Sequence, residues 1–154
     1  MESTPVTRAM EALGIPFTLH RHPQPVRTLE QAARERGLEA MQIIRSLVFR
    51  VEEGTFVMVL MAGPGPLSWP KLRRHLGVSR MTTATADEVR RATGYEPGAV
   101  SPFGLPGPLR ILADRSVLVW EILSLGAGIG DAGVILKRDD LLRALMLEVG
   151  DFAE

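Results

Sequence analysis

The chain has 154 residues, with 18 lysines and arginines against 18 aspartates and glutamates, 45% apolar residues and no cysteine. These values predict a single globular domain over residues 1–154, exclude a disordered or collagen-like chain, and exclude disulfides, thiolate nucleophiles and cysteine-ligated metals. The polar N-terminus lacks the features of a signal peptide, and no apolar stretch approaches the ~20 residues of a membrane helix. We therefore expect a cytoplasmic protein without membrane contact.

Charge is unevenly distributed along the chain. Residues 1–91 carry +4 (13 basic, 9 acidic) and residues 92–154 carry −4 (5 basic, 9 acidic), and 16 of the 18 basic residues are arginine. Arginine forms planar, bidentate contacts with phosphate. Solvated helix surfaces account for this pattern, with a transient polyanion contact as the open alternative. A high-affinity, salt-driven duplex DNA binder is not expected.

Helical and strand patterns alternate at the start of the chain. Apolar spacing predicts a helix over 4–13, and alternation predicts a strand over Ile15–His20. A capping box of Thr28 and Gln31 predicts a helix over Leu29–Arg36.

A hairpin and two short helices are predicted next. The apolar, β-branched runs Ile43–Val51 and Thr55–Met61 are joined by a Glu-Glu-Gly turn. Ser68 is placed to cap a helix that ends at Gly77, and a second capping box, Thr85 with Glu88, opens a helix that ends at Gly94.

The remaining chain predicts a long irregular segment followed by short elements. Four glycines and four prolines between residues 94 and 108 exclude regular structure there. Strands are expected over Leu109–Ala113, Leu118–Leu123 and Val134–Leu136, and a last helix from Asp139 to about Leu147. The order favours a mixed α+β or α/β domain around a largely antiparallel sheet, because regular βα alternation is missing.

Two short motifs have simple structural explanations. Gly128, Gly130 and Gly133 match the dinucleotide fingerprint GxGxxG, but a strand and not a helix follows them. We interpret them as a glycine-rich strand connection, with a pocket-lining role left open. Ser68 and Lys71 match S-x-x-K without its companion motifs, so Ser68 is interpreted as a helix cap.

His20, Arg21 and His22 form a small cluster at the end of the first predicted strand. Two imidazoles could hold a metal, but the spacing supplies no third ligand. A surface or pocket-rim position is therefore favoured for both histidines, and no metal is expected.

The segment from Gly94 to Gly104 is the strongest candidate for a functional loop. It holds Tyr95, Val100 and Phe103 between glycines and prolines, where a connecting loop normally carries polar residues. Glycines let backbone N–H groups approach a ligand, and such groups can stabilise an oxyanion. A rigid structural loop packed by its aromatic side chains is an equal alternative.

At this loop the chain resembles the YbaK / prolyl-tRNA synthetase-associated domain family, which clears mischarged aminoacyl-tRNA. The matching stretch is Thr93–Gly104 (TGYEPGAVSPFG). His22-Pro23 and Thr28, the strand entry Ile43–Phe49, and Asp114 before the connection at Ala127-Gly128 follow the family pattern in the same order. The resemblance covers nearly the whole chain and implies a mixed, partly barrel-like sheet flanked by helices.

The resemblance implies an enzyme, a trans-acting aminoacyl-tRNA deacylase that hydrolyses the ester of mischarged tRNA. The implied substrates are small amino acids, Ala, Cys or Ser, on tRNA(Pro). The implied partners are the tRNA acceptor end and, transiently, prolyl-tRNA synthetase, without a cofactor. Two alternatives stay open: a catalytically silent paralogue that binds aminoacyl-tRNA or an amino acid, and an unrelated small-molecule hydrolase or ligand-binding protein.

Site residues also follow from the resemblance. Family deacylases usually carry lysine where this chain has Arg45, and this substitution favours the silent alternative. The expected catalytic residues are Arg45, Gly98 and Ser101. The expected substrate-binding residues are His22, Thr28, Ser46, Pro102, Phe103, Gly104, Ala127 and Gly128.

Overall fold

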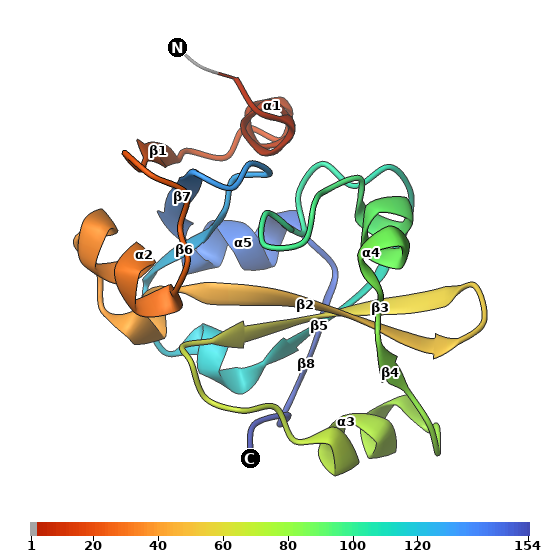
Figure 1. The fold of residues 1–154 in the computed structure, drawn as a ribbon. Helices are drawn as coiled ribbons and strands as arrows, with labels where there is room; N and C mark the ends of the chain where they lie inside the picture. Colours follow the sequence, from red (N-terminus) through yellow and green to blue (C-terminus); the bar gives the residue numbers. More distant parts are fainter. Residues whose placement is uncertain (1–2) are drawn as a thin grey trace.

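A five-stranded and a three-stranded sheet form the framework of the computed structural model, which describes residues 3–154 (Figure 1). The helices are α1 (Pro5–Ala12), α2 (Leu29–Arg36), α3 (Trp69–Leu76), α4 (Ala86–Thr93) and α5 (Arg138–Ala144), with 3-10 turns η1 (Ala40–Gln42) and η2 (Arg115–Leu118). The strands are β1 (Thr18–Arg21), β2 (Ile44–Glu52), β3 (Thr55–Ala62), β4 (Thr82–Thr83), β5 (Arg110–Asp114), β6 (Ile122–Gly126), β7 (Ala132–Lys137) and β8 (Leu147–Gly150). Within the described residues, no helix is long and apolar enough to cross a membrane.

The sheets combine antiparallel and parallel pairing. The larger sheet has the order β4-β2-β3-β5-β8, antiparallel from β4 to β3 and parallel from β3 to β8. The smaller sheet, β1-β7-β6, is antiparallel throughout. A single bridge between Ile43 and Ser124 links the two sheets without closing a barrel. The expected mixed, largely antiparallel fold is confirmed.

Apolar residues cover both faces of the larger sheet. Met58 and Leu60 of β3 face the main core, which the smaller sheet, α1 and α4 complete. Val57 and Val59 face a second core under α3. Because both faces of β3 are buried, its sequence is a continuous apolar run and lacks the alternation of a half-exposed strand.

The predicted hairpin and the three capped helices from residue 29 to residue 93 are confirmed. The Ser68 hydroxyl accepts from the backbone N–H of Lys71 at 3.3 Å, which confirms its interpretation as a cap. One detail of the expected box at Thr28 differs. The Gln31 side chain accepts from the backbone N–H of Arg27 and not from that of Thr28.

Three predicted boundaries are wrong. Strand β1 begins only at Thr18, because the buried Ile15 donates its N–H back to Met10 and closes the end of α1. The strand expected over Leu118–Leu123 starts at Ile122, because Asp114 accepts from Ser116 at 3.0 Å and begins the 3-10 turn η2.

The last predicted helix is also too long. Helix α5 ends at Ala144, and Leu147–Gly150 forms β8, which the sequence reading missed. This strand pairs in parallel with β5, so a long-range contact overrides the local helical pattern.

Candidate functional site

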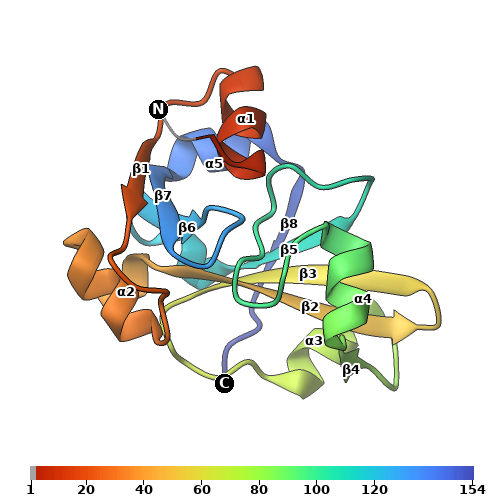
Figure 2. The ribbon, with the colours of Figure 1, turned by 45° about the horizontal axis from the view of Figure 1, so that its top comes forward.

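A cavity of about 360 Å³ lies where α2, the start of β2 and the loop after α4 meet. Figure 2 shows α2 beside the start of β2, with the segment after α4 descending over β2 and β3. This volume lies at the lower end of the range of small-molecule sites. The lining residues are Val26, Arg27, Thr28, Leu29, Ala32, Arg36, Ile43, Ile44, Arg45, Ser46, Leu47, Gly98, Val100 and Gly126.

The first half of β2 is accessible because its sheet neighbour is short. Strand β4 pairs only with Phe49 and Arg50, so the edge of β2 before them carries no β4 partner. Arg45 and Ser46 lie on this uncovered part and line the cavity. Thr28 and Gly98, two further predicted site residues, line the same cavity from α2 and the loop.

Arg45 and Ser46 each hold a buried polar atom without a partner. The Arg45 Nη2 donates to the carbonyl oxygen of Gly65, but its buried Nε has no acceptor, and the Ser46 hydroxyl is buried without a hydrogen bond. They are the two such side-chain atoms among residues 3–154. Leaving a buried polar group unpaired costs about 1–3 kcal/mol, so the pair is an unusual feature of a folded chain. Both residues line the cavity, so two unpaired polar groups lie beside its wall.

The cavity is cationic. Three arginines, Arg27, Arg36 and Arg45, line it, and no aspartate or glutamate does. Burial lowers the pKa of Arg45, and it lowers the pKa of Arg36 to about 10, so both guanidinium groups stay charged at neutral pH. The cavity therefore attracts anionic groups.

His22 lies behind the cavity and does not line it. Its ring is buried, with Nδ1 2.7 Å from Glu35 Oε1, and its Nε2 accepts from Arg36 Nε at 3.1 Å. His20 packs edge-on against it, and burial, followed by the nearby cationic groups, lowers the pKa of His20. No group of three metal-ligating side chains occurs in the part of the chain that the structure describes.

The loop from Gly94 to Gly104 has a packed interior and an exposed tip. The buried Tyr95 donates its hydroxyl to the carbonyl oxygen of Phe103, and the Ser101 hydroxyl accepts from Phe103 N at 3.1 Å. Gly98, with φ +88°, is exposed and lines the cavity. Ser101, Pro102, Phe103 and Gly104 hold the loop together and do not line the cavity, and the roles expected for them stay predictions.

The glycine-rich connection joins β6 to β7, and Gly126, the last residue of β6, lines the cavity. Ala127 is fully buried, and Gly128 packs so closely on Tyr95 that a Cβ there would lie 2.8 Å from Cε1 of the ring. A strand, β7, follows Gly130, which confirms the interpretation as a strand connection. The sequence analysis did not select Arg36 or Gly126 as site residues. Arg36 was missed because an arginine in the last turn of a helix resembles an ordinary charge that stabilises the helix end.

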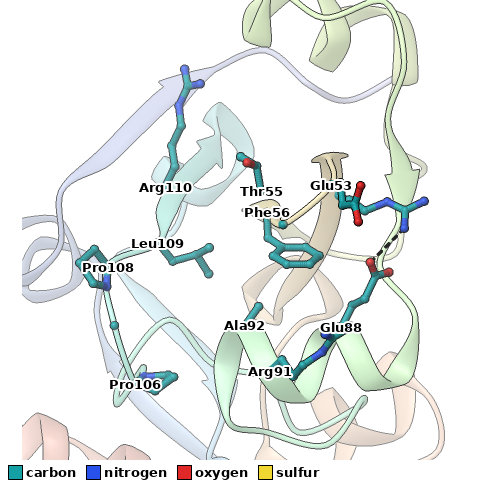
Figure 3. A pocket seen from close by; sticks show the side chains of 13 residues that line it. Glu53, Thr55, Phe56, Glu88, Arg91, Ala92, Pro106, Pro108, Leu109 and Arg110 are labelled. Atoms are coloured by element: carbon teal, nitrogen blue, oxygen red, sulfur yellow. Dashed lines mark hydrogen bonds and ion pairs between the residues drawn. The ribbon is translucent and has the colours of Figure 1, made fainter.

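A larger cavity of about 950 Å³ lies between α4, the β2–β3 turn and the segment entering β5 (Figure 3). Phe56 and Leu109 are among the residues that line it, and none of the predicted site residues does. Its charged groups are already largely paired: Arg50 with Glu88 at 3.1 Å, and Arg110 with a carboxylate outside the cavity. It holds no orphaned polar atom, so the smaller cavity is the candidate site.

Known proteins resemble this chain in sequence and in fold. The sequence profile of the aminoacyl-tRNA editing domain matches residues 23–144, which include every residue lining the candidate cavity. The chain belongs to the aminoacyl-tRNA editing domain family. This confirms the resemblance carried by the loop motif.

Curated relatives of the editing domain are proline–tRNA ligases. The enzyme of Trichlorobacter lovleyi is 35% identical over 106 residues, covering 69% of this chain and 18% of the ligase. That of Xanthomonas campestris pv. campestris is 32% identical over 126 residues, covering 79% of this chain and 22% of the ligase. The chain spans about a fifth of the length of the curated relatives it matches.

Solved structures match the editing domain over its whole length. A crystal structure described as that of a proposed trans-editing enzyme for prolyl tRNA synthetase has a TM-score of 0.90 and 30% identity, with 100% of this chain and 99% of that chain covered. A crystallised hypothetical protein has a TM-score of 0.88 and 27% identity, with 97% and 99% covered. Both crystallised chains are about as long as this chain and have the same fold.

Proposed function

We propose that this editing domain hydrolyses the ester bond of mischarged aminoacyl-tRNA, with the 3′ end of the tRNA in the candidate cavity. The observation that carries the proposal is a cavity lined by three arginines and no acid, whose wall includes Arg45 and Ser46, the two residues with an unpaired buried polar atom. An aminoacylated 3′ end supplies the groups that such a wall binds, namely phosphates for the cationic lining and ester and hydroxyl oxygens for its hydrogen-bond donors.

The proposed chemistry is attack by water on the ester carbonyl. A tetrahedral oxyanion forms, the bond to the ribose oxygen breaks, and this oxygen takes up the proton lost by the attacking water and leaves as a hydroxyl. The Arg45 guanidinium and the backbone N–H groups at the exposed tip around Gly98 are the donors for the oxyanion. Ser46 orients the ester, and Thr28 borders the amino-acid end. Arg45 stays protonated, so it acts as a hydrogen-bond donor and not as a general base.

The proposed substrates are small amino acids, Ala, Ser or Cys, on tRNA(Pro). The relation to proline–tRNA ligases and to a proposed trans-editing enzyme supports tRNA(Pro) as carrier, cytoplasmic action in trans, and a transient contact with prolyl-tRNA synthetase. The small volume of the cavity supports an amino acid with a small side chain. Selection by size is limited, because one extra methylene changes the binding free energy by only about 1–3 kcal/mol.

The test is single-turnover deacylation of Ala-, Ser- and Cys-tRNA(Pro), with Pro-tRNA(Pro) as the correctly charged control. We expect selective loss of one mischarged ester, and a rate at least about 100-fold lower for Arg45→Ala, the loss typical of removing one oxyanion donor. Arg50→Ala is the matched control, because Arg50 lies on the same strand outside the cavity and pairs with Glu88. An Arg45→Ala rate equal to that of the wild type removes Arg45 from the mechanism.

A silent binding protein is the second candidate function. The hydrogen bond from Arg45 Nη2 to the carbonyl of Gly65 favours it, because that bond ties part of the guanidinium to the protein and away from a reacting ester. Esters that stay intact at saturating protein, while the tRNA is bound, would establish this alternative.

A further inference from the structure

Arg36 is a cavity residue to which the proposed reaction assigns no role. It is the last residue of α2, where an arginine ordinarily extends into solvent and compensates the helix dipole. Here the guanidinium points inward instead. Its Nε donates to His22 Nε2 at 3.1 Å, and its Nη1 donates to the Ser124 hydroxyl at 2.8 Å.

The opposing strand leaves room for this guanidinium. A Cβ added at Gly133 in β7 would lie 2.1 Å from Cζ of Arg36 and 2.5 Å from its Nε, far inside contact distance. Gly133 does not have the left-handed backbone that demands glycine elsewhere in the chain. The glycine is therefore required by the space that the Arg36 side chain occupies.

A chain of hydrogen bonds fixes the orientation of Arg36. His22 accepts through Nε2, so its proton lies on Nδ1 and is donated to Glu35 Oε1 at 2.7 Å. Gln31 donates to the other carboxylate oxygen of Glu35 at 2.9 Å. On the other side, the Ser124 hydroxyl donates to a backbone carbonyl of β7 at 2.9 Å. His22 and Glu35 are thus positioning residues for the guanidinium.

Arg36 lines the cavity and keeps N–H donors without a partner. A guanidinium has five N–H groups, and two of those of Arg36 are used. The other three have no acceptor among residues 3–154, and Nη2, which carries two of them, is not sealed from solvent as Arg45 Nε is. Arg36 and Arg45 line the same cavity from different elements.

We propose that Arg36 is a second anion-binding group of the cavity and binds a phosphate of the nucleotide that carries the aminoacyl ester. This rests on the proposed function, because it names the part of the same substrate that Arg36 recognises. The aminoacyl end offers a neutral ester and a cationic amine, so phosphate is the anion available to a fixed guanidinium. Planar, preorganised arginine suits phosphate better than a flexible charge.

The test compares two substrates that differ in phosphate. One is the mischarged aminoacyl-tRNA that the wild type hydrolyses, and the other is the same amino acid esterified to adenosine, which has none. For Arg36→Met we expect KM for aminoacyl-tRNA to rise about tenfold or more, with kcat little changed, and no change on aminoacyl-adenosine. Arg36→Lys should rescue part of the loss. Arg34→Met is the matched control, because Arg34 lies on the same helix, exposed and outside the cavity.

Each other outcome has a defined meaning. A KM for aminoacyl-tRNA that is unchanged in folded Arg36→Met overturns the proposal, and an equal rise on both substrates overturns the assignment to phosphate. If Arg36→Met does not fold, Gly133→Ala keeps the arginine and displaces its guanidinium, and it must raise KM in the same selective way. If the wild type hydrolyses neither substrate, the proposed function fails. In that case binding of uncharged tRNA is measured instead. Weaker binding by Arg36→Met supports the phosphate contact, and unchanged binding overturns it.

Discussion

Ser46→Ala should leave the folded protein as stable as the wild type, or more stable, while impairing its activity. The Ser46 hydroxyl is buried without a partner, and burying a hydroxyl unpaired costs about 1–3 kcal/mol. Removing it relieves this cost and leaves a gap of one atom beside an existing cavity. We expect the free energy of unfolding to stay level or rise by about 1 kcal/mol.

Ser124→Ala is the matched comparison, because it removes the same atom from a satisfied site. The Ser124 hydroxyl accepts from Arg36 at 2.8 Å and donates to Val134 O at 2.9 Å. Losing both bonds leaves a buried cation short of an acceptor and should cost about 1–3 kcal/mol. The free energies of unfolding of the two serine variants should therefore differ by about 2 kcal/mol, with only Ser124→Ala less stable than the wild type.

Urea unfolding followed by the fluorescence of Trp69 and Trp120 measures this difference. With a slope of about 1–3 kcal/mol per molar urea, 2 kcal/mol separates the midpoints by roughly 1 M. Deacylation by Ser46→Ala, measured in parallel, should fall even though the protein is no less stable. If Ser46→Ala loses as much stability as Ser124→Ala, the hydroxyl has a partner in the folded protein and the argument from an orphaned group is refuted.

Gly128→Ala should destabilise the protein by about 2–3 kcal/mol, because residue 128 has φ +84° and a Cβ would lie 2.8 Å from the Tyr95 ring. Gly130→Ala, which meets nothing within 4 Å, should change the thermal midpoint little, and equal losses would contradict this reading. Burial raises the pKa of Asp114, but hydrogen bonds, including those from the backbone of Ser116 and Phe152, lower it overall. The stabilisation is therefore present above the pKa of the unfolded chain and lost as pH falls through the lower folded value, so Asp114→Asn should lose about 1–3 kcal/mol at pH 7. Urea midpoints of the two proteins should converge below about pH 4, and a constant gap would contradict the assignment.

Helix boundaries could be predicted from the sequence, because capping residues close to each end determine them. The helix over Leu29–Arg36 and the capped helix from Ala86 are marked by residues within one turn of each end, and the structure places them at those bounds. Strand β8 depends on pairing with β5, more than thirty residues earlier, and nothing near Leu147 signals that contact. The periodicity of a segment does not show which distant strand it pairs with, so strands of this kind are missed.

The residues of the candidate site also fall into those that the sequence could identify and those that it could not. Arg45 and Gly98 could be selected because strand entry and loop motif identify them, and both line the cavity. Arg36 could not be selected, because helical periodicity gives the direction of its Cβ but not the inward turn of a long side chain. Gly133 offered a signal, since the space that Arg36 needs is visible in the sequence only as a glycine that no turn requires.

The position of β5 between two parallel neighbours has a consequence for how the chain folds. The β2–β3 hairpin closes through a two-residue turn at Glu53-Gly54, and such hairpins form within about 1–10 μs. The parallel pairs must first bring together distant segments, Val57 with Arg110 and Ile111 with Leu147, so they pay loop-closure entropy before any contact repays it. Until β5 docks, the apolar edge of the hairpin is an open template for other chains. Refolding yield should therefore decline with protein concentration, even where the native state is stable.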